Sequence, residues 1–127
     1  MSRAFVNDGR FVERLIHTGQ HYDFEMSESF FQALELPAPA VNLGIGGLSH
    51  GAMTGRMLEA IEADLIAHRP DGVLIYGDTN STLAGALAAA KLKIPVIHLE
   101  AGMRSGRPES PEEINRIVTD SIADILW

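Results

Sequence analysis

The sequence predicts an α/β protein built on a parallel sheet with helices on both faces. Two short runs, 72–76 (GVLIY) and 94–99 (IPVIHL), are almost wholly apolar, which is typical of strands buried on both faces of a parallel sheet. Helical patterns alternate with these runs along the chain, and such alternation favours strand–helix–strand units. The 127 residues are enough for one domain at most.

The first third of the chain contains weaker signals. Residues 11–18 (FVERLIHT) mix apolar and charged side chains and end before a glycine, so we expect a strand there. In 26–34 the apolar side chains share one helical face, and Pro37 and Pro39 end that helix. Residues 42–51 (NLGIGGLSHG) follow no convincing strand and lack the third glycine of a dinucleotide-binding loop, so we reject that fingerprint.

A long amphipathic helix is predicted for 52–68, with Ser49 as its N-cap. Its apolar side chains recur at every fourth position, which places them on one face. They are Met53, Met57, Ile61 and Leu65. We expect this face to pack into the core.

Two further helices follow the two apolar strands. Thr79 or Asn80 caps a helix rich in alanine and leucine that runs to about Leu92. Pro111 stands at the first turn of the last helix, 112–125, where proline is favoured. The chain stops inside an apolar run (ADILW) that is typical of the start of another strand, which indicates a truncated domain.

Composition excludes several classes of function. The chain has no cysteine, which removes disulfides, thiolate metal sites and a thiol nucleophile. Its formal net charge of −7 argues against non-specific nucleic-acid binding, which draws its affinity from lysine and arginine. No apolar run approaches the length of about 18 residues that spans a membrane. Residues 1–11 also lack the apolar core of a secretory signal, so we expect a cytoplasmic protein.

Two carboxylates directly follow the two apolar strands. In open α/β sheets ligands bind outside the carboxyl ends of the strands, which directs attention to Asp78 and Glu100. If the two strands are neighbours, their ends lie about 5 Å apart, and paired carboxylates there suit general acid–base chemistry. Two plainer interpretations remain open: Asp78 as a turn or capping residue, and Glu100 as the ion-pair partner of Arg104 or Arg107.

The remaining polar groups give weaker signals. Glu112 and Arg116 lie four residues apart on one face of the last helix, and this spacing alone favours a surface ion pair. The hydroxyl-rich segment 77–82 (GDTNST) at a helix N-terminus suits either an anion site or plain capping. The five histidines show no metal-ligand spacing, so no metal site is expected. Among them, His21 in a strand-end loop is the best candidate for a functional role.

Four segments together resemble the non-hydrolysing UDP-N-acetylglucosamine 2-epimerase family. They are TGQHYD (18–23), NLGIG (42–46), GDTNSTLAGALAAAKLKIPVIHLEAGMRS (77–105) and PEEINR (111–116). The resemblance covers nearly the whole chain, and the motifs stand in the family's order. It implies a Rossmann-like half of a GT-B-type two-domain fold, truncated at both ends. Residues 1–127 would be a partial N-terminal domain, without the first strand and the C-terminal UDP-binding domain.

The resemblance also implies a reaction and its residues. The family interconverts UDP-N-acetylglucosamine and UDP-N-acetylmannosamine through elimination and re-addition of UDP, which requires a base at C2 and stabilisation of the leaving diphosphate. Its essential residues match Asp78, Glu100, Glu112 and Arg116. Bacterial members are activated by a second UDP-N-acetylglucosamine, and the residues of that regulatory site match Gln20, His21 and Arg56. No metal or other cofactor is implied, and the full-length protein is expected to be a homodimer.

Three alternatives remain open. A 2-epimerase for a diacetamido uronic-acid nucleotide fits the same motifs. A receiver-like signalling domain would use Asp78 as a phosphoryl acceptor, but neither an acidic pair after the first strand nor a lysine after the last is visible. A non-catalytic remnant would keep the same residues without turnover. We expect the 127 residues alone to be marginally stable and inactive.

Overall fold

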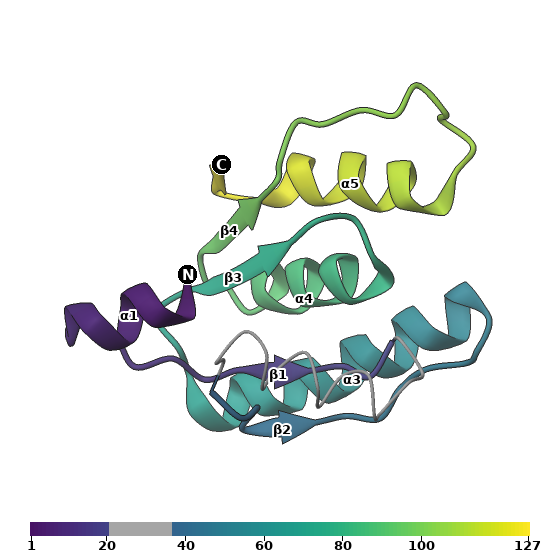
Figure 1. Ribbon diagram of the computed structural model, residues 1–127. Helices are drawn as coiled ribbons and strands as arrows, with labels where there is room; N and C mark the ends of the chain where they lie inside the picture. Colours follow the sequence, from purple (N-terminus) through teal and green to yellow (C-terminus); the bar gives the residue numbers. More distant parts are fainter. Residues whose placement is uncertain (21–36) are drawn as a thin grey trace. The chain divides into compact units, whose positions relative to one another are not determined.

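The computed structural model describes residues 1–20 and 37–127, and the chain divides into two compact units, Met1–Gly47 and Leu48–Trp127 (Figure 1). Each unit contains its own parallel sheet. The first sheet consists of β1 (Ile16–His17) paired with β2 (Val41–Asn42), and the second has three strands. Strands that run parallel confirm the predicted class of sheet.

The first unit begins with helix α1 (Ser2–Asp8), which is followed by the β1–β2 pair. The strand predicted for 11–18 is confirmed in place, but only its residues 16 and 17 pair. The helix predicted for 26–34 lies outside the described residues.

Strand β2 corrects the interpretation of the glycine-rich loop, because that loop does follow a strand. The pairing of the two chain segments continues beyond β1 and β2. Leu43 N–H donates to the carbonyl of His17, and Ile45 N–H donates to that of Thr18, each over 2.8 Å. A two-residue strand is too short to show an alternation of apolar and polar side chains, so no periodic pattern predicted it.

The loops that follow β1 and β2 pack backbone against backbone. A Cβ at Gly46 would lie 2.5 Å from the carbonyl oxygen of Gly19. A Cβ at Gly19 would lie 2.9 Å from the Cα of Gly44. Gly19 also has a φ of +83°, in the left-handed region that favours glycine. Both loops therefore require glycine for their close approach.

Replacing Gly46 by alanine should destabilise the first unit by about 1–3 kcal/mol, the usual cost of adding a methyl group where there is no room. Gly55, in helix α3 (His50–His68), is the matched control because nothing lies within 4 Å of its Cβ position. Gly55→Ala should stabilise the second unit by about 0.5–1 kcal/mol, since alanine is the better helix former. Urea midpoints of both variants test the pair, and a neutral Gly46→Ala would contradict the close packing.

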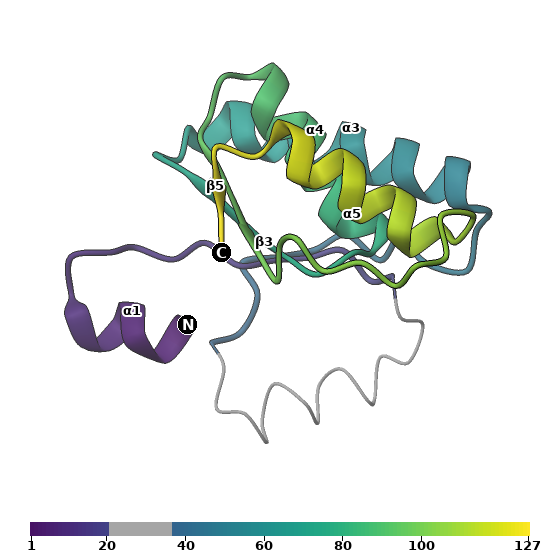
Figure 2. The same cartoon turned by 90° about the horizontal axis from the view of Figure 1, so that it is seen from above.

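The second unit places its parallel strands in the order β3-β4-β5, so that β4 is central. Its elements are α3 (His50–His68), β3 (Val73–Tyr76), α4 (Asn80–Lys91), β4 (Val96–Leu99), α5 (Pro111–Ile122) and β5 (Ile125–Leu126). The three helices lie on the same side of this sheet, and α4 packs against both of the others (Figure 2). The helices predicted for this part are confirmed, and so is the strand expected in the ADILW run.

Helices α3 and α4 pack closely because small side chains of α4 meet the apolar face of α3. The four α3 residues predicted to face the core are all buried: Met53, Met57, Ile61 and Leu65. On α4, four alanines have no exposed surface: Ala84, Ala86, Ala88 and Ala89. Alanine combines high helix propensity with a side chain short enough to let two helices approach.

The start of α4 is fixed by a reciprocal cap. The Thr79 hydroxyl accepts the N–H of Thr82, and the Thr82 hydroxyl accepts the N–H of Thr79. The Thr82 hydroxyl also donates to the carbonyl of Tyr76 over 2.5 Å. Thr79 is thereby confirmed as one of the two predicted capping residues, and the cap sets the position of Asp78 just before it.

The face of the second sheet away from its helices carries exposed apolar surface. Ile75 packs toward α4, because a Cβ at Gly85 would lie 3.2 Å from its Cγ2. Side chains alternate along a strand, so neighbouring Tyr76 points to the other face, and it is 50% exposed.

In the part of the chain that the structure describes, none of the helices combines the length and the hydropathy that crossing a lipid bilayer would need.

Candidate active site

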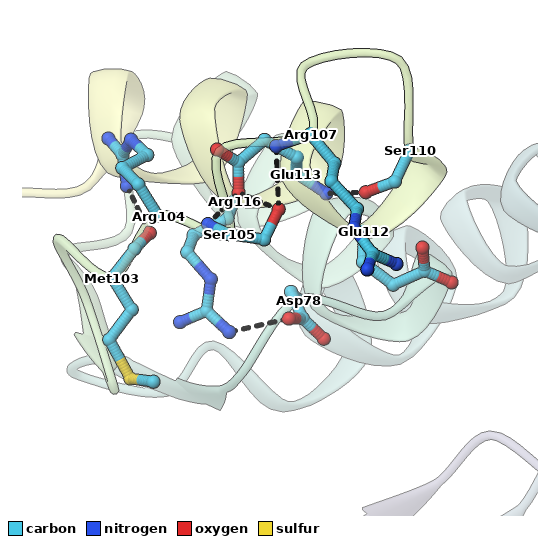
Figure 3. A pocket seen from close by; sticks show the side chains of 9 residues that line it. All are labelled: Asp78, Met103, Arg104, Ser105, Arg107, Ser110, Glu112, Glu113 and Arg116. Atoms are coloured by element: carbon cyan, nitrogen blue, oxygen red, sulfur yellow. Dashed lines mark hydrogen bonds and ion pairs between the residues drawn. The ribbon is translucent and has the colours of Figure 1, made fainter.

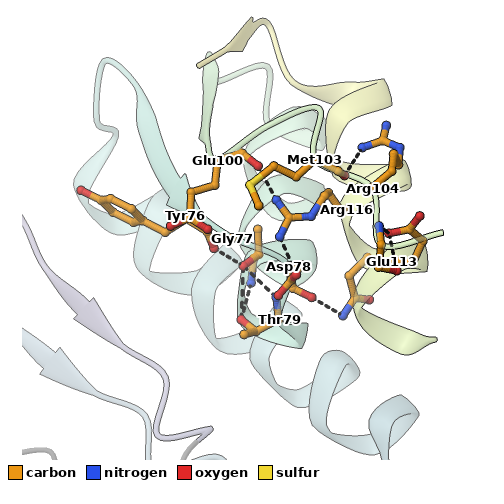
Figure 4. A network of polar contacts seen from close by, with 12 residues as sticks. Tyr76, Gly77, Asp78, Thr79, Glu100, Met103, Arg104, Glu113 and Arg116 are labelled. Atoms are coloured by element: carbon orange, nitrogen blue, oxygen red, sulfur yellow. Dashed lines mark hydrogen bonds and ion pairs between the residues drawn. The ribbon is translucent and has the colours of Figure 1, made fainter. Parts of the chain in front are cut away.

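Asp78 and Glu100 stand side by side at the carboxyl edge of the second sheet. Strands β3 and β4 are neighbours, with Tyr76 opposite Leu99, which meets the condition for pairing the two carboxylates. Gly77 N–H continues the pairing by donating to the Leu99 carbonyl over 3.1 Å. A Cβ at Gly77 would lie 3.7 Å from Glu100 Oε2, so this carboxylate lies over the residue that precedes Asp78 (Figure 4).

Arg116 of α5 connects the two strand-end loops. Its guanidinium donates to Asp78 Oδ2 over 2.5 Å and also to the carbonyl oxygen of Glu100. The Arg116 side chain is 7% exposed and that of Asp78 is 32% exposed. Arginine suits this position because its planar group carries several N–H donors in a fixed arrangement. The observed pair replaces the ion pair between Glu112 and Arg116 that spacing alone favoured.

The Glu100 carboxylate is not paired with Arg104, which was one of its predicted partners. Arg104 donates instead to Asp120 Oδ2 over 2.7 Å. No residue that the structure describes forms an ion pair with the Glu100 carboxylate, so Arg107 is not its partner either. The plain interpretation of Glu100 as an ion-pair residue is therefore wrong.

The Glu100 backbone is strained. Its φ is +64°, in the left-handed region. That conformation costs a residue with a Cβ roughly 1–2 kcal/mol. Strain of this kind is typical of functional sites, where it fixes the direction of a side chain. Here it directs a solvent-accessible carboxylate to the edge of the sheet.

An open cavity of about 500 Å³ lies between these loops and the first turn of α5 (Figure 3). Arginines and carboxylates line it together with Met103 and two serines. The charged residues are Arg104, Arg107, Arg116, Asp78, Glu112 and Glu113. Arginines gathered in a concave surface are typical of sites for phosphate or carboxylate groups, and exposed carboxylates beside them supply acid–base groups.

Glu113 holds the loop that forms one wall of the cavity, and sequence reasoning missed it. Its carboxylate accepts the N–H of Ser105 over 2.9 Å and the Ser105 hydroxyl over 3.1 Å. The Ser105 N–H holds the pKa of Glu113 below its ordinary value. The residue is 6% exposed and its own N–H donates to the N-cap, Ser110. The one signal in the sequence was the pair of adjacent glutamates in PEEINR, of which one has a structural role.

Replacing Glu113 by glutamine should lower the thermal stability of the second unit at neutral pH, because the amide is a poorer acceptor for the Ser105 N–H than a carboxylate. A carboxyl whose folded pKa is depressed contributes stability above its unfolded pKa, and loses that contribution as the pH falls through the folded pKa. The difference in Tm between the parent and Glu113→Gln should therefore close as the pH falls below about 4.3, the ordinary pKa of glutamate. Thermal melts from neutral to acidic pH test this, and a gap that stays constant would contradict it.

The predicted site residues are distributed unevenly. Asp78, Glu100 and Arg116 come together directly, and Glu112 lines the cavity as an exposed residue in the first turn of α5. Of the predicted regulatory residues, Gln20 belongs to the first unit, Arg56 is exposed on α3 of the second, and His21 lies outside the described residues. Residues 1–20 and 37–127 contain no group of three histidine or acidic side chains placed to hold a metal.

Comparison with known proteins decides the family. A sequence profile of the family described as UDP-N-acetylglucosamine 2-epimerase matches residues 3–127. The chain belongs to this family. Membership of the epimerase family agrees with the parallel sheet and with the order of the motifs at its carboxyl edge.

Relatives of this epimerase-family chain come from archaea and bacteria. A UDP-N-acetylglucosamine 2-epimerase homolog of Methanococcus maripaludis is 59% identical over 117 residues, which are 92% of this chain and 33% of that protein. The UDP-2,3-diacetamido-2,3-dideoxy-D-glucuronate 2-epimerase of Pseudomonas aeruginosa is 54% identical over 127 residues, which are the whole chain and 36% of that protein.

A solved structure confirms the fold. The UDP-GlcNAc 2-epimerase of Methanocaldococcus jannaschii, in complex with UDP-GlcNAc and UDP, superposes with a TM-score of 0.93 at 48% identity. The match covers 98% of this chain and 34% of that one. The epimerase-family chain thus has the fold of the matching part of these GT-B-like relatives, and it spans about a third of their length.

Proposed function

We propose that this chain forms part of an enzyme that inverts C2 of a UDP-sugar and interconverts UDP-N-acetylglucosamine and UDP-N-acetylmannosamine. The observation that supports the proposal is the grouping of Asp78, Glu100 and Arg116 beside an open cavity lined by arginines. Elimination of UDP needs a base that removes the C2 proton and cations that stabilise the leaving diphosphate. Re-addition after protonation on the other face of C2 completes the inversion.

The geometry favours different roles for the acidic residues. Asp78 is engaged by Arg116 over 2.5 Å, so we assign it to holding the guanidinium in place. Glu100 and Glu112 have exposed carboxylates that no hydrogen bond from the described residues occupies. Either of these two is available to take or return the C2 proton. We assign Arg116 to the charge that develops on the leaving diphosphate.

The remaining features of the whole protein are part of the same proposal. We assign the chain to the N-terminal domain, and we assign the holding of UDP to a C-terminal domain like that of its relatives. Gln20, His21 and Arg56 remain predicted contacts for a regulatory UDP-N-acetylglucosamine. A cytoplasmic homodimer remains the expected form of the whole protein.

Deuterium exchange tests the chemistry. The chain is examined alone and as a chimera, in which it replaces the matching stretch of the Methanocaldococcus jannaschii enzyme. Each protein is incubated with UDP-N-acetylglucosamine in D₂O and followed by proton NMR. We expect the chimera to remove the C2 proton signal and to form the manno epimer, and the chain alone to do neither. A folded chimera without C2 exchange would overturn the proposal, and exchange by the chain alone would show that the remaining domain is dispensable.

A second substrate has specific support. The Pseudomonas aeruginosa relative, which is named for a UDP-diacetamido-glucuronate, matches the whole chain at 54% identity. Offering both nucleotide sugars to the chimera at equal concentration decides between them, because the ratio of their kcat/KM values measures preference directly. We expect UDP-N-acetylglucosamine to be preferred in this chimera, and the opposite ratio would assign the chain to the uronate branch.

A further inference from the structure

A fully buried histidine stands directly beneath the proposed active site. His98 lies in the central strand β4 and has no exposed surface. Its Nδ1 is 2.7 Å from Asp120 Oδ1, and its Nε2 is 2.7 Å from the carbonyl oxygen of Gly77. Both ring nitrogens therefore face oxygen atoms at hydrogen-bond distance.

The chemistry of these two oxygens determines how many protons the His98 ring carries. A backbone carbonyl only accepts hydrogen bonds, so Nε2 must donate to Gly77. Burial alone would raise the pKa of Asp120, but hydrogen bonds from Arg104, Gly102 N–H and His98 hold it below its ordinary value. Asp120 is therefore a carboxylate that accepts, and Nδ1 must donate as well. A ring that donates from both nitrogens is an imidazolium.

The second oxygen of Asp120 extends the contact to the next loop. Asp120 Oδ2 accepts a hydrogen bond from Arg104 Nη1 over 2.7 Å and one from the N–H of Gly102 over 3.1 Å. Asp120 comes from α5, Gly77 directly follows β3, and Gly102 lies in the loop that follows β4. One buried pair, His98 and Asp120, thus joins the three segments that carry the proposed catalytic groups.

We propose that His98 is a buried imidazolium that positions the active site. Through the Gly77 carbonyl it fixes the loop that presents Asp78, and through Asp120 it fixes the loop that follows Glu100. It is a positioning residue and touches no substrate. The inference deepens the proposed function and rests on it for its kinetic consequences, while the charge of the ring stands on the hydrogen bonds alone.

The protonation of the ring is tested by NMR with ¹⁵N-labelled histidine at about pH 7.5, above the ordinary histidine pKa of about 6.5. The signals that disappear in His98→Gln identify the ring. We expect both His98 nitrogens to carry a directly bonded proton. The chimera is used for the same spectrum if the chain alone is unfolded. A bare nitrogen on His98 would overturn the assignment.

The positioning role is tested by two variants that each keep half of the contacts. In His98→Gln the side-chain N–H₂ group reaches as far as Nε2 and retains the Gly77 contact. In His98→Asn it reaches only as far as Nδ1 and retains Asp120. Misplacing a catalytic group by about 1 Å costs up to about a hundredfold in rate. We therefore expect kcat of the chimera to fall about a hundredfold in His98→Asn and about tenfold or less in His98→Gln, with little change in KM.

The outcomes separate the two proposals. Equal losses in both variants, or a rise in KM with kcat unchanged, would overturn the positioning role. Circular dichroism at the assay temperature shows whether a variant is folded, and only folded variants are compared. A parent chimera that is folded but inactive speaks against the proposed function, and the nitrogen spectrum then decides the His98 assignment alone.

Discussion

Replacing Arg116 by lysine should lower kcat/KM of the chimera for C2 epimerisation by about a hundredfold or more. Arg116 donates to Asp78 and to the Glu100 carbonyl from two different nitrogens, and a single ammonium group cannot reproduce both contacts. Loss of one preorganised donor at a site of developing charge costs about 10²–10³ in rate. Integration of the two sugar signals by NMR during the first turnovers measures the effect.

The matched control makes the same chemical change at Arg69, at the C-terminal end of α3. Arg69 ends that helix, lies outside the cavity and is exposed. Arg69→Lys should leave kcat/KM within about twofold of the parent, because lysine keeps both the Cβ and the positive charge at an exposed position. Similar losses in both variants would indicate a general disturbance of the fold and would contradict the assigned role of Arg116.

Replacing Glu100 by glycine in the chimera should stabilise the second unit and slow C2 exchange. Glycine adopts the φ of +64° without strain, so the free energy of unfolding should rise by about 1 kcal/mol. Loss of the carboxylate should lower the rate of C2 exchange by about 10²–10⁴, the usual contribution of a general acid or base. Thermal melts and exchange rates on the same preparation measure both effects.

Glu100→Gln separates the two causes. It keeps the Cβ, and with it the strained backbone, but removes the charge. We expect it to lose exchange to a similar extent as Glu100→Gly, with stability close to that of the parent. If the glutamine variant retains full exchange, Glu112 is the remaining candidate for the C2 base.

The parts of the fold that were predictable are those in which local pattern and tertiary packing agree. The repeat at Met53, Met57, Ile61 and Leu65 predicted the buried face of α3, because periodicity of about 3.6 residues places them together. The apolar strands β3 and β4 and the threonine cap of α4 were predictable for the same reason. By contrast, β1 and β2 are two residues long and leave almost no pattern.

The two strand-end carboxylates of the candidate site were predictable from the sequence. The contact partners of Arg116 and His98 were not. Asp78 and Glu100 follow directly from their places at the ends of β3 and β4. The partner of Arg116 lies 38 residues away in the sequence, and that of His98 lies 22 residues away. Neither contact leaves a periodic signal, because each depends on how α5 is rotated against the sheet. The apolar run around His98 therefore indicates burial of this residue but not the partners of its ring.

The four fully buried alanines of α4 set the dynamics of the second unit. With no side chain longer than a methyl group at Ala84, Ala86, Ala88 and Ala89, the α4 backbone is enclosed by α3, α5 and the sheet. Its amide protons reach solvent only when the whole unit opens, whereas loops open by local fluctuation. In native-state hydrogen exchange α4 should therefore be the last segment to exchange, and its rate should report the global stability of the scaffold beneath the site.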